Sequence, residues 1–155
     1  MRFVGSIEAK IDDKGRAFLP SAFRKVMEAA GEAQFVLCKD VFQSCLVLYP
    51  ESVWNEQLDR LRLRLNRWNK QHRQLLRQLT RNAMPVGMDR NGRILLPKRS
   101  LGMVAIGQDV LFSGMDDTIE LWNPRMADEA DMDVEVFAGA LEQVLGQDVS
   151  VAENV

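Results

Sequence analysis

A nine-residue pattern occurs twice in this chain, and the two copies lie 77 residues apart. The first is Asp12-x-x-Gly15-Arg16-x-x-Leu19-Pro20 and the second is Asp89-x-x-Gly92-Arg93-x-x-Leu96-Pro97. An Asp shortly before a Gly is typical of a tight turn, because the carboxylate accepts backbone amides and Gly adopts a positive φ without steric cost. A following Pro ends a strand and suits the first position of a helix. Each copy therefore predicts a turn, a short strand that carries an Arg, and a helix start.

The arginines of the pattern, Arg16 and Arg93, are candidate ligand-binding residues. A guanidinium group presents a planar set of donors that suits phosphate or the edge of a guanine base. Further cations flank the turns and the helix starts, namely Lys14, Arg24, Arg90, Lys98 and Arg99. A second interpretation is that Arg16 and Arg93 pair with Asp12 and Asp89 and only brace the turns. The two interpretations are compatible, because the Asp can orient the Arg toward a ligand.

The residues around each copy predict the same order of elements. Alternation from Phe3 to Ile11 indicates a half-buried strand, and residues 20–30 read as a short helix. Short apolar runs at 35–38 and 45–49 indicate a hairpin. The second copy repeats this order with strands at 86–88, 94–96, 110–112 and 119–122, and a helix from Pro97. The chain thus reads as a mixed α/β protein with two β-rich units, at residues 1–50 and 83–124.

Residues 51–82 predict one long helix between the two units. Apolar residues recur at intervals of three, four or seven, as on one helical stripe: Trp54, Leu58, Leu61, Leu65, Trp68, Leu75 and Leu79. The same segment carries eight cations between Arg60 and Arg81, and no acid occurs between Asp59 and Asp89. This basic face is open to three interpretations: solvent exposure, contact with an acidic segment of a neighbouring subunit, or contact with phosphates.

The charges are strongly segregated along the chain. Residues 1–99 hold 19 Lys/Arg and 10 Asp/Glu, whereas residues 100–155 hold one Arg and 12 acids, so the formal net charge of −2 conceals a basic and an acidic part. Such asymmetry suggests a nucleic-acid face apart from an acidic region. Residues 125–155 predict two short helical stretches that end near Leu145 and a loose tail from Gly146. This acidic segment either solvates the terminus or shields the basic face of a neighbour.

The residues from Ile11 to Arg24 resemble the first half of the MraZ family of bacterial transcriptional regulators. Residues 46–50 with Trp54 are similar to its middle, and residues 88–97 and 119–122 to its second half. The resemblance covers about residues 1–124. One copy of the pattern alone would indicate only the broader SpoVT-AbrB class of DNA-binding domains, whereas two copies at this spacing are specific for MraZ.

This resemblance implies two SpoVT-AbrB-like units packed as an intramolecular pseudo-dimeric barrel, joined by the long helix and followed by an acidic helical C-terminus. It also implies a homo-oligomeric ring that binds direct repeats of double-stranded DNA in the promoter of the division and cell-wall gene cluster. The family's Asp-x-x-x-Arg motif maps onto Asp12 and Arg16, and onto Asp89 and Arg93. We accordingly expect a cytoplasmic, nucleoid-associated regulator that requires no cofactor.

The remaining residues argue against other classes of protein. His72 is the only His, which leaves neither a catalytic triad nor a metal site, and no phosphate-cradling glycine motif occurs. We therefore expect no catalytic residues, no metal and no small-molecule substrate. No apolar run is long enough for a membrane span, and Cys38 and Cys45 are expected to be buried free thiols. The alternative to a regulator is an oligomeric scaffold that uses the same fold without specific DNA binding.

Overall fold

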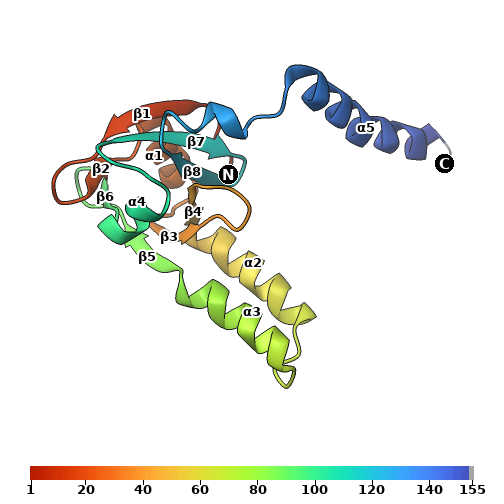
Figure 1. The fold of residues 1–155 in the computed structure, drawn as a ribbon, viewed down its shortest axis with the longest axis horizontal. Helices are drawn as coiled ribbons and strands as arrows, with labels where there is room; N and C mark the ends of the chain where they lie inside the picture. The colour runs from red at the N-terminus through yellow and green to blue at the C-terminus, as the bar shows by residue number, and fades with distance from the viewer. Residues whose placement is uncertain (154–155) are drawn as a thin grey trace.

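The computed structural model describes the backbone of residues 1–153 and the side chains of residues 1–146. Two sheets lie at the centre, a helical hairpin projects from one side, and the last helix extends away from the body (Figure 1). The strands are β1 (Ser6–Lys10), β2 (Arg16–Phe18), β3 (Gln34–Lys39), β4 (Leu46–Pro50), β5 (Met84–Gly87), β6 (Arg93–Leu95), β7 (Asp109–Met115) and β8 (Thr118–Trp122). The helices are α1 (Ser21–Ala29), α2 (Glu51–Arg64), α3 (Lys70–Arg81), α4 (Lys98–Met103), the 3₁₀ turn η1 (Asp128–Ala130) and α5 (Val134–Glu153).

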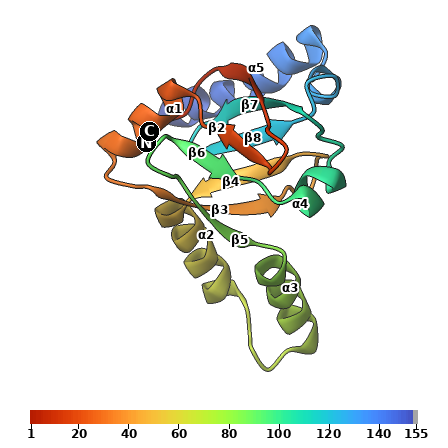
Figure 2. The ribbon, with the colours of Figure 1, turned by 90° about the vertical axis from the view of Figure 1, so that its left-hand side faces the viewer.

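The larger sheet interleaves strands from the two sequence copies. Its antiparallel order is β1-β7-β8-β4-β3-β5. β1 of the first copy pairs with β7 of the second, and β5 of the second pairs with β3 of the first. The closing strands of the two copies, β4 and β8, meet in the middle (Figure 2). The order is unchanged when the copies are exchanged, which is the mark of an approximate two-fold axis. Each copy therefore depends on the other to complete its part of the sheet.

The pseudo-dimeric arrangement is present, but the described residues form no closed barrel. β1 and β5 are the open edges of the six-stranded sheet, and β2 and β6 form a separate two-stranded ribbon. The expected barrel is therefore replaced by a sheet and a ribbon that enclose one core. Large side chains from both copies meet in this core, among them Phe3, Phe23, Phe35 and Phe112. The rings of Phe3 and Phe23 pack edge to face with centroids 5.6 Å apart.

The segment 51–82 is a hairpin of two helices, so the expectation of one long helix was wrong. α2 ends at Arg64, and α3 begins after Asn69, whose side chain accepts the amide of His72 at 3.1 Å. The Asn66 side chain accepts the amide of Trp68 at 2.9 Å, and His72 Nδ1 accepts the amide of Asn66 at 3.0 Å. These local bonds stabilise a break between the helices, because Asn offers the backbone an alternative to helical bonding.

The break changes the position of the predicted apolar stripe. Trp54 is buried with Val36 and Cys38, and Leu79 packs on this cluster, so the base of the hairpin is attached to the outer face of β3. Trp68 and Leu75 instead lie in the solvent. Both thiols are free and buried, as expected, and burial raises the pKa of the Cys45 thiol to about 12.

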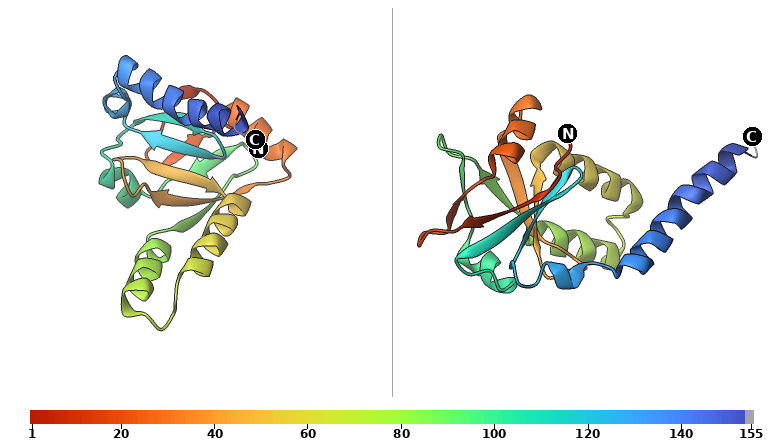
Figure 3. Two further views of the ribbon diagram at one scale, coloured as in Figure 1. Left: turned by 90° about the vertical axis from the view of Figure 1, so that its right-hand side faces the viewer. Right: turned by 90° about the horizontal axis from the view of Figure 1, so that it is seen from above.

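The acidic C-terminal segment also differs from its prediction. The first of the two expected helical stretches is only the 3₁₀ turn η1, and the second is α5, which continues past Gly146 to Glu153 instead of ending in a loose tail. α5 extends away from both sheets in the right-hand view of Figure 3. No helix within residues 1–153 is both long enough and apolar enough to cross a bilayer.

Candidate nucleic-acid interface

The β2–β6 ribbon places both pattern arginines on one face. Its register pairs Arg16 with Leu95, Ala17 with Ile94, and Phe18 with Arg93. Directly opposite residues of an antiparallel pair share a face, and successive residues alternate between faces. Ala17 and Ile94 point into the core and are buried. The outer face therefore carries Arg16, Phe18, Arg93 and Leu95, arranged symmetrically about the Ala17–Ile94 pair.

In the first turn one carboxylate accepts three hydrogen bonds, two of them from Arg16. Asp12 Oδ1 accepts the backbone amides of Lys14 at 2.9 Å and of Arg16 at 2.8 Å. Asp12 Oδ2 accepts from Arg16 Nε at 2.9 Å. The amide of Gly15 donates to the carbonyl of Asp12 at 3.0 Å, which closes the turn. The carboxylate thus fixes the backbone and the direction of the guanidinium together.

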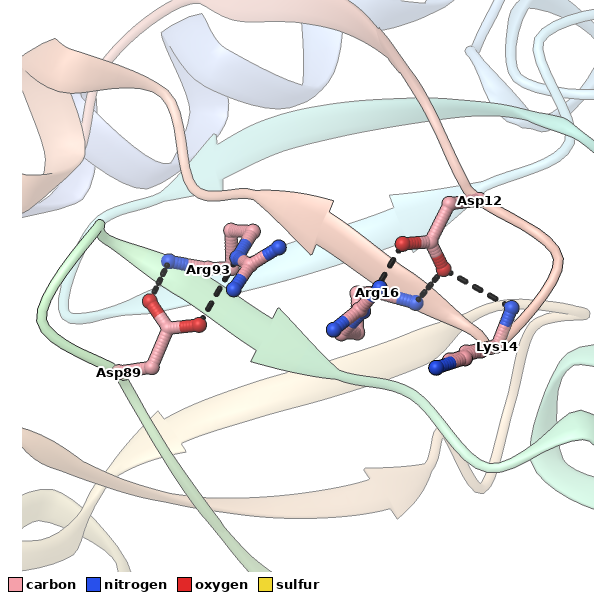
Figure 4. Close-up of polar contacts among 5 residues, drawn as sticks. All are labelled: Asp12, Lys14, Arg16, Asp89 and Arg93. Carbon is pink, nitrogen blue, oxygen red and sulfur yellow. Dashed lines mark hydrogen bonds and ion pairs between the residues drawn. The ribbon is translucent and has the colours of Figure 1, made fainter.

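The second turn repeats this geometry with different intervening residues (Figure 4). Asp89 Oδ1 accepts the amides of Asn91 and Arg93, each at 2.9 Å, and Oδ2 accepts from Arg93 Nε at 2.8 Å. Side-chain exposure is also similar, at 35% for Arg16 and 28% for Arg93. Both arginines therefore pair with the Asp of their turn, which is compatible with bracing alone and with orientation toward a ligand. Within residues 1–146, no acceptor bonds their terminal Nη groups, which leaves these donors available to a ligand.

The donated bonds change the acidity of both carboxyl groups. Bonds from the backbone of the following Arg are the main cause that lowers the pKa of Asp12 and of Asp89, and bonds from the Arg side chain act in the same direction. Both carboxylates are therefore charged at neutral pH. In each turn the charges of Asp and Arg cancel, and the guanidinium remains directed to the outer face.

The two turns are joined to the helix starts of the opposite copies. The amide of Leu96 donates to the carbonyl of Gly15 at 2.7 Å, and the amide of Leu19 donates to the carbonyl of Gly92 at 3.0 Å. The first turn therefore lies against the chain that enters α4, and the second against the chain that enters α1. We call these the α4 corner and the α1 corner. Each corner is built from both copies.

The remaining predicted cations divide between these corners. Lys14 lies in the first turn, and Lys98 and Arg99 begin α4, so all three belong to the α4 corner. Arg90 lies in the second turn, and the Arg24 side chain covers Gly92, so both belong to the α1 corner. Arg24 is half-buried, whereas the other four residues are exposed. The structure thus brings every predicted cation to an end of the ribbon.

The pattern glycines are required by geometry at both turns. Gly15 has φ of +88° and Gly92 has φ of +81°, in the region that favours glycine. A Cβ on Gly15 would lie 2.5 Å from the carbonyl oxygen of Leu96, which is backbone. A Cβ on Gly92 would lie 2.4 Å from Arg24 Nη1, which is the end of a side chain.

The residues that sequence reasoning missed are Phe18 and Leu95. Both side chains are more than half exposed and lie beside the arginines on the outer face. Their signal was present in the sequence, because each stands two positions from a pattern Arg, on the exposed side, within a predicted strand. Among residues 1–153, no group of His, Cys, Asp and Glu is arranged to hold a metal ion.

Comparison with known proteins decides the family. The family model described as "MraZ protein, putative antitoxin-like" matches residues 2–78 and 79–126. The chain belongs to the MraZ family. Each matched segment contains one of the two Asp–Gly–Arg turns, and the boundary between the segments falls inside α3.

Curated members of the family are similar over nearly the whole chain. The "Transcriptional regulator MraZ" of Phocaeicola vulgatus is 49% identical over 97% of this chain and 98% of its own length. Proteins of the same name from Bacteroides fragilis and Bacteroides thetaiotaomicron are 46% and 47% identical, over 99% and 96% of this chain. The similarity includes most of the acidic C-terminal segment, beyond the part that the family model matches.

Proposed function

We propose that this chain is a sequence-specific regulator of transcription that binds double-stranded DNA through the outer face of the β2–β6 ribbon. The observation that carries the proposal is the pair of Asp-braced arginines on one exposed ribbon. The major groove of B-form DNA is wide enough to admit a two-stranded β-ribbon. An Arg held through Nε retains its two Nη groups, which can donate to guanine O6 and N7.

Each group on the face then has a separate role. Arg16 and Arg93 read base edges, while Phe18 and Leu95 contact thymine methyl groups, which are the apolar feature of the major groove. Lys14, Lys98 and Arg99 at one corner, and Arg24 and Arg90 at the other, bind the flanking phosphates. Phosphate contacts fix position and base contacts fix sequence. The acidic C-terminal segment lies at the far end of the body from the ribbon (Figure 1), so the net charge of −2 does not weaken this interface.

The wider biological setting completes the proposal. The relatives are known as transcriptional regulators, which supports the same role for this chain. Resemblance to the family supports a homo-oligomeric ring that binds direct repeats in the promoter of the division and cell-wall genes, in the cytoplasm at the nucleoid. Several weak ribbons on one particle bind repeated sites far more tightly than one ribbon does, because later contacts form within the complex.

The test is binding of promoter DNA from upstream of the chain's own gene by Arg16→Ala/Arg93→Ala. We expect the variant to stay folded and to lose specific binding, while the wild-type affinity falls steeply with salt as counterions are released. Arg62→Ala/Arg64→Ala is the matched control, since it removes two exposed arginines far from the ribbon. Normal binding by the ribbon variant refutes the proposal, and absent binding by the wild-type chain favours the scaffold alternative.

A further inference from the structure

Helix α5 presents an apolar stripe that no described part of its own chain covers. Val134, Phe137, Leu141 and Leu145 recur at intervals of three and four, which places them on one side of a helix. Their exposed fractions are 81%, 57%, 46% and 55%. A 20-residue helix is about 30 Å long, so this is a large projecting surface. A soluble chain rarely exposes an extended apolar stripe unless a partner covers it.

Acidic residues border this stripe. Asp133 precedes it, and Glu135 and Glu142, seven residues apart, lie along one of its edges. Asp128, Glu129 and Asp131 lie just before the helix, and residues 126–146 contain no Lys or Arg. The partner surface must therefore be apolar at its centre and cationic at its rim.

The tip of the α2–α3 hairpin has this composition. Trp68 is 93% exposed at the tip. Beside it lies a hollow of about 440 Å³, lined by Arg67, Trp68, Arg73, Leu76, Arg77 and Thr80. Its lining is mainly apolar, three of the six lining residues are arginines, and residues 60–88 contain no acid. A buried Trp flanked by Arg is typical of the centre of a protein interface.

We propose that α5 of one copy of this chain docks into the hairpin hollow of another copy. Phe137 and Leu141 enter the hollow against Trp68 and Leu76, and Glu135 and Glu142 pair with Arg73 and Arg77. α5 and the hairpin point in different directions from one body (Figures 1 and 3), so the contact joins two chains. This inference rests on the oligomer of the proposed function and identifies the two surfaces that build it.

The contact is head to tail, because the two surfaces differ. Each chain has one α5 and one hairpin, so contacts repeat until a ring closes. The β2–β6 ribbon lies at the opposite end of the body from α5, so docking leaves every ribbon free for DNA. Assembly and DNA binding thus use separate surfaces, and each can be disrupted alone.

A mixing experiment with full-length chains tests the proposal. One variant, Arg73→Glu/Arg77→Glu, retains a working α5, and the other, Phe137→Asp/Glu142→Arg, retains a working hairpin. By light scattering we expect the wild-type chain to be an oligomer and each variant alone to be a monomer. The mixture should form a 1:1 heterodimer, because the working α5 of one variant can still dock into the working hairpin of the other. Arg62→Glu/Arg64→Glu is the matched control, since it changes charge on the same hairpin outside the hollow and should leave the mass unchanged.

Three outcomes overturn the inference. The first is a wild-type chain that is monomeric, and the second is a folded variant, by circular dichroism, of unchanged mass. The third is that Arg73→Glu/Arg77→Glu keeps the wild-type mass but loses affinity for DNA, which would show that the hairpin contacts phosphates. Failure of the DNA proposal has a different signature, because Arg16→Ala/Arg93→Ala should keep the full mass whatever its effect on DNA.

Discussion

The two turns reach the same geometry from different sequences. The first turn is Asp12-Asp13-Lys14-Gly15 and the second is Asp89-Arg90-Asn91-Gly92. An acid at the second position of one turn is replaced by a base in the other, yet the Asp-to-Arg bonds have lengths within 0.1 Å of each other. The Asp, Gly and Arg therefore determine the turn, and the two residues between them are free to differ.

The corners around these turns are where the copies diverge. α4 begins with Lys98 and Arg99, whereas the equivalent positions of α1 are Ser21 and Ala22. Arg24 and Leu101 are also equivalent, since each amide donates to the carbonyl of the Pro four residues earlier. Cations thus sit at different places in the two corners. In the proposed complex, a symmetric pair of arginines flanked by asymmetric phosphate contacts would give the ribbon a direction on DNA, which suits a site without internal two-fold symmetry.

The largest difference between the copies should appear on replacing each glycine by Ala. Both positions have positive φ, which costs an alanine about 1 kcal/mol. Gly15→Ala must also displace the backbone carbonyl of Leu96, so we expect a total loss of about 2–3 kcal/mol. Gly92→Ala displaces only the Arg24 side chain. Its loss of stability should therefore stay near the ~1 kcal/mol that the positive φ costs by itself. Urea unfolding measures both, and an equal loss would show that the two turns are equally confined.

Single replacement of the arginines tests whether the two halves of the ribbon contribute equally. Arg16→Ala and Arg93→Ala should each weaken operator binding by about 1–3 kcal/mol and relax base preference on one half of the site. The expectation of similar losses follows from the matching bonds to Asp12 and Asp89. Competition binding with operators mutated in one half provides the measurement. A loss confined to one variant would show that only one half of the ribbon enters the groove.

Arg24→Leu makes the two corners more alike, because α1 then carries the same residue as α4 has at the equivalent position, Leu101. We expect unchanged stability, because the side chain is only half-buried. The slope of log affinity against log salt concentration should fall by about one, because one phosphate contact is lost. The neighbouring substitution Lys25→Leu is the control, since Lys25 is exposed and Arg24 alone covers the turn. An unchanged salt slope would mean that Arg24 only packs on Gly92.

The smallest effect concerns acid stability. The pKa values of Asp12 and Asp89 in the folded chain lie below the ordinary value of 3.8. The stability that the two charged carboxylates contribute is therefore fully present above pH 3.8 and is lost as the pH falls through the lower pKa of the folded state. Asp12→Asn/Asp89→Asn cannot titrate, and its amide nitrogens face Arg Nε. We expect the variant to be less stable than the wild-type chain at pH 7, with the gap narrowing below about pH 4. Urea midpoints across this range measure it, and a constant gap would contradict the assignment.

What the sequence determined by itself was short-range. The Asp–Gly–Arg turns, the proline-initiated helices and the hairpin of β3 and β4 depend on residues a few positions apart, and all formed as predicted. The break at residues 65–69 was also encoded locally, in Asn66 and Asn69, but the regular leucine spacing concealed it. Tertiary structure decided the rest. Strand exchange between the copies and the sharing of each corner depend on which distant strands meet, because the pairing partner of a strand is chosen by packing over the whole fold and not by its own residues alone.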